Sequence, residues 1–123
     1  MPPIPDELTE AQVDELTAAL AELQGSLRQH LEASRDSAAP VKLDQTSVGR
    51  LSRMEAMQGQ QMAAANRRGA RLRLDRVGAA LKSAEAGEYG YCRSCEDPIG
   101  YRRLRAQPEA PFCLACQGRR ERR

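Results

Sequence analysis

All four cysteines of this 123-residue chain lie in two Cys-x2-Cys pairs, Cys92/Cys95 and Cys113/Cys116, separated by 17 residues. A Cys-x2-Cys turn directs two thiolates to one side, and two such turns can complete the tetrahedron of sulfur ligands that Zn²⁺ accepts. The spacing therefore predicts one structural Zn²⁺ held by these four residues.

Two other uses of the cysteines have less support. A pair of structural disulfides would suit an exported chain, but the first residues, Met-Pro-Pro-Ile-Pro-Asp, resemble no secretory leader. A thioredoxin-like redox pair would sit in a βαβ pattern, which surrounds neither cysteine pair. His30 is the single histidine, and we do not expect it to be a ligand because four thiolates already fill a tetrahedral shell.

The aromatic residues limit where a globular core can form. The chain has no Trp, and its four aromatic residues all lie between positions 89 and 112. The rest of the chain has only aliphatic groups to bury, so a thick core is not expected there. No apolar run is long enough to span a membrane, and cysteine usage of this kind fits a reducing cytoplasm.

The net charge of +2 is unevenly distributed, because the first 40 residues contain eight acids and two bases. Four zinc-bound thiolates would add −4 and the ion +2, which brings the total to zero. This balance argues against direct DNA binding, although the last seven residues, Gln-Gly-Arg-Arg-Glu-Arg-Arg, form a positive tail.

Residues 9–35 are predicted to form one long helix. Thr9 and Gln12 fit a capping box at its start. Apolar residues follow in alternating steps of three and four, at Val13, Leu16, Leu20, Leu23, Leu27 and Leu31. A narrow stripe of this kind is typical of a coiled coil and requires a partner helix.

Residues 36–47, which include Pro40, interrupt the helical pattern, and a second helix is predicted over residues 48–86, ended by Gly87. Its expected apolar face consists of Leu51, Met54, Gln58, Met62, Ala65, Gly69 and Leu72, followed by Val77, Leu81 and Ala84. We expect an antiparallel hairpin with its tip at 36–47 and with the unmatched end of the second helix leading into the metal module.

The predicted protein is therefore mainly α. Residues 1–86 form a long antiparallel coiled-coil hairpin, residues 87–117 a small zinc-ribbon-like module with four cysteine ligands, and residues 118–123 a short basic tail that is either helical or disordered. A monomer is expected. The arginines of the second helix are expected to form a solvated face and to bridge to the acids of the first; they are Arg67, Arg68, Arg71, Arg73 and Arg76.

The metal module carries a dense set of residues that resembles the DksA/TraR family, bacterial regulators that bind RNA polymerase. The matching positions are Gly87, Tyr89-Gly90-Tyr91-Cys92, Cys95, Ile99-Gly100, Arg102-Arg103-Leu104, Ala106, Pro108, Ala110, Cys113 and Cys116-Gln117. The resemblance implies a non-enzymatic transcription regulator. Its hairpin would enter the secondary channel of the polymerase, with the tip toward the active centre, and would modulate initiation.

The tip departs from the family pattern Asp-x-x-Asp-x-Ala. Asp44 matches the first Asp, whereas Ser47 and Gly49 replace the second Asp and the Ala. We expect these three residues to form the tip that faces the polymerase active centre. Asp44 alone carries a carboxylate there, and it is equally suited to cap the second helix.

A second set of departures concerns the alarmone guanosine tetraphosphate, a partner that the resemblance also implies. Arg76 matches one basic position of the family's alarmone site, but the other two positions hold Gln107 and Gln117. We therefore expect no alarmone response through that site, and keep Arg73 and Arg76 as candidate contacts to phosphate or polymerase. Glu96 replaces a family Gly, which would strain the first knuckle if φ is positive there.

Two other function classes remain open from the sequence alone. A zinc-ribbon protein could bind nucleic acid through its arginines, Arg93, Arg102, Arg103, Arg105 and the tail. A thiol redox enzyme would need a reactive Cys92 or Cys95. The sequence contains no Ser/His/Asp set, phosphate-binding glycine loop or recognisable carboxylate pair, so an enzyme is not expected.

Overall fold

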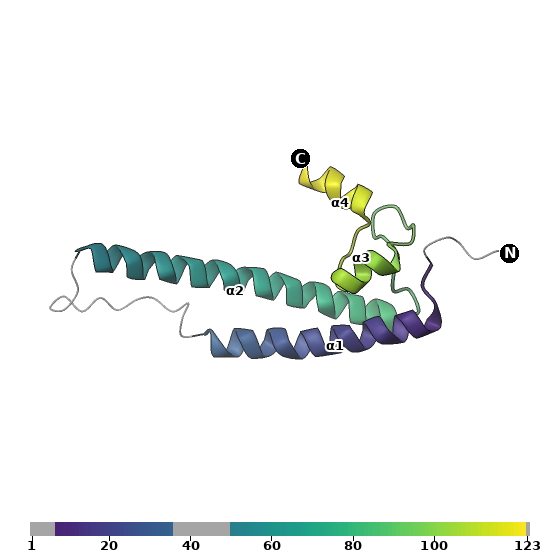
Figure 1. The fold of residues 1–123 in the computed structure, drawn as a ribbon, viewed down its shortest axis with the longest axis horizontal. Coiled ribbons are helices and arrows are strands. Elements are labelled where there is room, and N and C mark those ends of the chain that lie inside the picture. Colours follow the sequence, from purple (N-terminus) through teal and green to yellow (C-terminus); the bar gives the residue numbers. More distant parts are fainter. Residues whose placement is uncertain (1–6, 36–49, 123) are drawn as a thin grey trace.

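The computed structural model of the chain describes residues 7–35 and 50–122, which contain four helices. They are α1 (Glu10–Ala33), α2 (Arg50–Glu85), α3 (Tyr101–Ala106) and α4 (Leu114–Glu121). Helices α1 and α2 lie side by side as an antiparallel pair, and α3 and α4 gather at the end where α1 begins and α2 ends (Figure 1). This arrangement confirms the predicted mainly α fold, a hairpin followed by a four-cysteine module.

Helix α1 has the cap and the apolar stripe that its sequence predicts. The side chain of Thr9 accepts from the backbone N–H of Gln12 at 3.1 Å, and Gln12 Oε1 accepts from the Thr9 N–H at 2.9 Å. These two bonds satisfy amides that the first turn of a helix leaves without partners. The apolar stripe faces α2, with Leu16, Leu20 and Leu27 buried.

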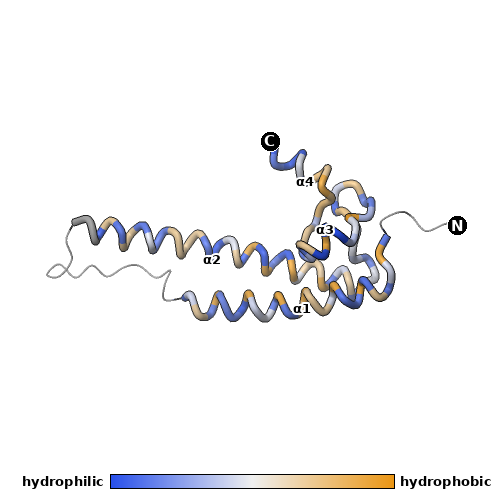
Figure 2. Tube along the Cα trace, viewed as in Figure 1, coloured by the Kyte–Doolittle hydropathy of each residue, from blue (hydrophilic) through white to orange (hydrophobic). Residues whose placement is uncertain are grey.

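Helix α2 contacts α1 through a different face from the one predicted over most of its length. Val77, Leu81 and Ala84 do belong to the core, as expected. Ala70 and Leu74 join them, whereas Met54, Met62 and Leu72 are 53%, 68% and 52% exposed. Apolar and polar residues alternate along both helices in Figure 2.

The difference between the predicted and the observed face of α2 has a geometric cause. The predicted face stepped by five residues from Leu72 to Val77, which turns about 140° around the axis of an α-helix. The observed seam keeps steps of three and four, so that Arg67, Ala70, Leu74 and Val77 all face α1. The methionines were misleading because they follow a regular period on the side of the helix opposite to the seam.

The register of the hairpin also differs from the prediction. The guanidinium of Arg67 donates to the carbonyl of Leu31 and, at 2.8 Å, to Ser34 Oγ, so that it caps the last turn of α1. The turns of α2 before Arg67 therefore extend beyond the end of α1, by about 26 Å at 1.5 Å per residue. The unmatched end of α2 is its beginning, remote from the metal module, and not its last turns as predicted.

The predicted ion pairs between the arginines of α2 and the acids of α1 do not form among the described residues. Arg73 bonds Glu109 of the module, and Arg67 bonds groups at the end of α1. The antiparallel register places the acidic first turns of α1 beside the last turns of α2, beyond these arginines. Glu15 in α1 and Glu7 just before this helix accept hydrogen bonds from tyrosines of the module instead.

The predicted tip residues Asp44, Ser47 and Gly49 lie outside the described residues. Within the described ranges, no helix combines the length and the apolar character that crossing a membrane requires.

Candidate metal centre

The chain enters the metal module through a glycine turn. Gly87 has a φ of 73°, its N–H donates to the carbonyl of Ala84 at 3.1 Å, and the next N–H, of Glu88, donates to Ser83 at 2.8 Å. These two bonds form a Schellman motif, in which the residue after the helix adopts the left-handed conformation that glycine tolerates best. The predicted helix-ending role of Gly87 is confirmed.

The first knuckle is a tight backbone loop around Cys92. Its N–H donates to the Asp97 carbonyl at 2.8 Å, and its carbonyl accepts from the Glu96 N–H at 2.9 Å. Among the described residues, Glu96 is the one non-glycine residue with a positive φ, of 65°. The strain expected where the family has Gly is thus present, at a cost of roughly 1 kcal/mol or more.

The second knuckle begins helix α4. Cys113 is the N-cap residue, and its Sγ accepts from the N–H of Cys116 at 3.5 Å. The helix continues to Glu121, so the basic tail is helical over these residues and not disordered. The N–H of Arg93 donates to the Pro111 carbonyl at 2.9 Å and ties the two knuckles together.

The four cysteine sulfurs come together in one cluster, in which the ligand atoms all lie within 4.8 Å of one another. Cys95 Sγ and Cys113 Sγ are 3.8 Å apart, and all four cysteines are free rather than disulfide-bonded. Sulfurs at about 2.3 Å from a tetrahedral Zn²⁺ would be about 3.8 Å apart. The cluster therefore fits one structural Zn²⁺, as the sequence predicts.

The crowding of the thiols separates their pKa values. Desolvation by burial raises the pKa of Cys92, but backbone hydrogen bonds from the two knuckles outweigh it and lower this pKa to about 6. For Cys95, a backbone hydrogen bond at Asp97 lowers the pKa, but desolvation and the three neighbouring thiols raise it to about 12. Thiolates this close together repel one another, and a divalent cation relieves that repulsion.

The module is attached to α2 by an ion pair between an exposed arginine and a buried glutamate. Arg73 Nε donates to Glu109 Oε1 at 2.8 Å, and Glu109 is only 3% exposed. Nearby, the hydroxyl of Tyr89 donates to the Pro108 carbonyl at 2.8 Å. Desolvation by burial, followed by the charge of Glu109, raises the pKa of Tyr89.

The module also contacts α1 and the residues just before it. Tyr91 donates to Glu7 Oε1 at 2.8 Å, and Tyr101 donates to Glu15 Oε2 at 2.6 Å. Leu8 packs so closely on Gly90 that an added Cβ would lie 2.8 Å from Leu8 Cδ1. The module is therefore attached to both helices of the hairpin.

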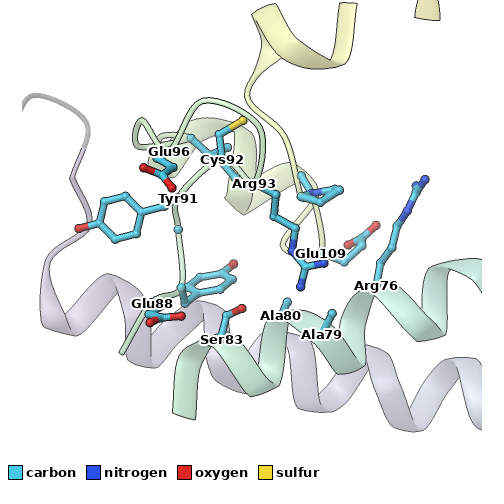
Figure 3. A pocket seen from close by; sticks show the side chains of 15 residues that line it. Arg76, Ala79, Ala80, Ser83, Glu88, Tyr91, Cys92, Arg93, Glu96 and Glu109 are labelled. Carbon is cyan, nitrogen blue, oxygen red and sulfur yellow. The ribbon is translucent and has the colours of Figure 1, made fainter. Parts of the chain in front are cut away.

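A cavity of about 650 Å³ lies between α2 and the module, with Arg76, Arg93 and Glu109 among its lining residues (Figure 3). The structure brings Arg76 and Gln107 together in an adjoining pocket of about 440 Å³, whose lining does not include Gln117. Of the two candidate phosphate contacts, Arg73 bonds Glu109, whereas Arg76 is exposed.

Two of the four aromatic rings, those of Tyr89 and Phe112, offer no free stacking surface for nucleic-acid bases, whereas the ring of Tyr91 is 37% exposed. Tyr89 is buried, and the guanidinium of Arg120 covers the Phe112 ring at 4.0 Å from its centroid. Arg103, a candidate phosphate contact, donates to the Phe112 carbonyl at 3.0 Å. These contacts weaken the nucleic-acid hypothesis, because single-strand binders stack bases on exposed rings.

Sequence reasoning missed helix α3 and the roles of Glu109 and Arg119. A single acid within the largely apolar segment 106–112 was a signal that Glu109 is buried with a partner. Arg119 follows Cys116 by three residues, which is the spacing that brings side chains together on a helix. Its guanidinium donates to Cys116 Sγ at 3.3 Å.

Comparison with known proteins identifies the module. Residues 87–122 match the model of the prokaryotic DksA/TraR C4-type zinc finger. The RNA polymerase-binding transcription factor DksA of Caulobacter vibrioides is 42% identical over 50 residues, which are 41% of this chain and 35% of that protein. The DksA of Escherichia coli K12 is 40% identical over 52 residues, 42% of this chain and 34% of that protein.

The similarity in fold extends further than the similarity in sequence. The structure of transcription factor DksA2 from Pseudomonas aeruginosa superposes with a TM-score of 0.71 and 25% identity, covering 98% of this chain and 92% of that one. In sequence, the chain spans only about a third of the length of the curated relatives it matches.

Proposed function

Because this chain belongs to the DksA/TraR C4-type zinc-finger family, we propose that it binds RNA polymerase and regulates transcription initiation without catalysing a reaction. The observation that carries the proposal is the similarity of the whole fold to DksA2, since it includes the hairpin as well as the zinc finger. The protein would then work in the cytoplasm, with the transcription machinery, as a monomer.

The proposed mode of action is mechanical. Helix α2 alone is 36 residues long, about 54 Å at 1.5 Å per residue, and a rod of this length can reach a recessed site that a globular domain cannot. We infer that the hairpin enters the secondary channel of the polymerase while the metal module rests outside. The ion pair between Arg73 and Glu109 and the tyrosine contacts to α1 would keep the rod at a fixed angle to the module.

In this proposal the tip residues Asp44, Ser47 and Gly49 point toward the active centre. The single carboxylate of Asp44 would act on the surroundings of the catalytic metal ion through its charge, because carboxylates are favourable neighbours of divalent cations. One carboxylate in place of two gives a weaker electrostatic effect.

Arg76 is our proposed contact to the polymerase or to a phosphate group, since it is exposed and lines the cavity beside the module. Guanosine tetraphosphate is a weaker candidate ligand for this surface. Gln107 supplies no charge beside Arg76, and Glu109 adds a negative one, so we propose that a polyphosphate gains little there.

The first test is a pull-down of core RNA polymerase by the zinc-loaded chain, with and without a transcript-cleavage factor that occupies the secondary channel. We expect binding that the cleavage factor displaces. Binding without displacement would reject the secondary-channel mode, and loss of binding to polymerase with steeply salt-dependent binding to DNA would favour the nucleic-acid function.

The second test is transcription in vitro from a ribosomal promoter with the wild-type chain and with Asp44→Asn. We expect the wild type to change promoter output and the variant to bind polymerase equally well with a smaller effect. No effect of the wild type would refute the regulatory function, and equal effects of both proteins would show that the Asp44 carboxylate is not the acting group.

A further inference from the structure

One cationic side chain, that of Arg119, donates a hydrogen bond to a sulfur of the metal centre. A Zn²⁺ ion with four thiolates carries a formal charge of −2, which must be offset by nearby donors. Backbone N–H groups supply part of this, for example the weak bonds from Ser94 to Cys92 Sγ at 3.4 Å and from Cys116 to Cys113 Sγ at 3.5 Å. Within residues 7–35 and 50–122, Arg119 is the only Arg or Lys whose side chain hydrogen-bonds a cysteine sulfur.

The position of Arg119 follows from helix α4. The helix starts at the second knuckle, and the three-residue spacing from Cys116 brings the guanidinium back over the sulfur, where Nη2 lies 3.3 Å from Cys116 Sγ. The adjacent Arg120 points elsewhere and stacks on Phe112. Arg119 therefore hydrogen-bonds a metal ligand, whereas its neighbour Arg120 stacks on an aromatic ring.

The same side chain lines a surface pocket beside Cys116. This pocket, of about 400 Å³, is lined by Ser94, Cys116, Arg119 and Arg120. Cys95 is the exposed ligand of the cluster, whereas Cys116 is only 3% exposed, and on its side of the cluster the guanidinium of Arg119 lies against its sulfur.

We propose that Arg119 is a positioning residue of the metal centre, which holds Cys116 as the zinc-bound thiolate and protects it from chelators and electrophiles. A charge-assisted hydrogen bond stabilises the thiolate over the thiol and disperses the negative charge that makes four thiolates repel one another. This role goes beyond binding to polymerase and does not depend on it.

The test uses the full zinc-loaded chain and its variants Arg119→Ala, Arg119→Gln and Arg119→Lys, with Arg120→Ala as the matched control. Transfer of zinc to the chromophoric chelator 4-(2-pyridylazo)resorcinol gives the release rate. Loss of an outer-shell partner usually weakens metal binding by about 10-fold or more, so we expect roughly 10-fold faster transfer from Arg119→Ala and Arg119→Gln, with partial recovery in Arg119→Lys. The control should match the wild type.

Two further readouts separate this role from a general loosening of the fold. Alkylation by iodoacetamide, followed by peptide mapping, should increase at Cys116 in Arg119→Ala before it increases at the other cysteines. In the Co²⁺-loaded proteins, the sulfur-to-cobalt charge-transfer band should shift in Arg119→Ala and Arg119→Gln but not in Arg120→Ala, at equal helical content by circular dichroism. Because Arg119 is exposed, the difference in release rate should shrink in about 1 M KCl.

The proposal is overturned if Arg119→Ala and Arg119→Gln release zinc at the wild-type rate, or if Arg120→Ala releases it as fast as they do. If Arg119→Ala loses helical content, Arg119→Gln decides the outcome, since it keeps a polar, helix-compatible side chain that is shorter and carries no charge.

Discussion

The ion pair between Arg73 and Glu109 predicts that two variants, one at each partner, lose different amounts of folding stability. The carboxylate of Glu109 is almost fully buried, whereas the Arg73 side chain is 45% exposed. Arg73→Met keeps most of the aliphatic stem but leaves a buried charge without its partner. Glu109→Gln leaves an arginine that water can reach.

The expected losses of folding free energy follow from this difference in burial. Removing one partner of a fully buried ion pair costs about 3–5 kcal/mol, and the exposure of Arg73 reduces this to about 2 kcal/mol for Arg73→Met. Glu109→Gln keeps an acceptor for the guanidinium and loses mainly the ionic part of the bond, about 1 kcal/mol. The double variant Arg73→Met/Glu109→Leu removes both charges and should be more stable than Arg73→Met alone.

Thermal unfolding of the zinc-loaded proteins, followed by circular dichroism, measures these differences. At roughly 4 °C per kcal/mol for a chain of this size, we expect Arg73→Met to melt about 8 °C below the wild type and Glu109→Gln about 4 °C below it. Equal losses, or a larger loss in Glu109→Gln, would refute the argument that desolvation of the carboxylate dominates this contact.

Three further predictions concern the metal module. Glu96→Gly should stabilise the zinc-loaded protein by about 1 kcal/mol in denaturant unfolding, because glycine relieves the φ of 65°. The phenols of Tyr89, Tyr91 and Tyr101 all have raised pKa values, so absorbance at 295 nm should show no tyrosine ionising at its ordinary pKa near 10. Their contribution to stability should be complete below pH 10 and lost above it, as the pH passes the raised pKa values. Zinc removal by a chelator should unfold the module but leave most ellipticity at 222 nm, since α1 and α2 supply 24 and 36 helical residues against 6 and 8 in α3 and α4.

Each of these predictions has a result that contradicts it. A less stable Glu96→Gly would mean that the glutamate side chain contributes more than its backbone costs. A tyrosine that titrates near pH 10 in the folded protein would contradict its hydrogen bond to a carboxylate or a carbonyl. Complete loss of helical signal after chelation would show that the hairpin depends on the module to fold.

The sequence predicted the parts of this protein that depend on local spacing. The cysteine pairs fix the metal cluster because a Cys-x2-Cys turn determines the positions of its own sulfurs. The capping box at Thr9 and the left-handed turn at Gly87 depend on a few adjacent residues. The stripe of α1 could be predicted because every position on it is a large aliphatic residue.

The sequence was less informative where a structural choice depends on partners far along the chain. The true seam of α2 includes a charged residue, Arg67, whose place there makes sense only once the end of α1 lies beside it. Helix α3 has six residues and is too short to show a periodicity. The apolar neighbours of Glu109 indicate that it is buried, but they do not show that its partner is Arg73, 36 residues earlier.

Arg67 caps the end of α1 and so divides α2 into two parts. Residues 67–85 lie beside α1, and residues 50–66 extend beyond its end. Of the α2 side chains that the structure describes, those in the buried core all lie at or after Ala70, beside the module. Residues 50–66 therefore lengthen the helix beyond the end of α1 and contribute little to the stability of the fold. A deletion of one heptad within residues 50–66 would shorten the protein by about 10 Å and leave the contacts between α1 and residues 67–85 intact. The length of this rod can therefore be changed separately from its fold.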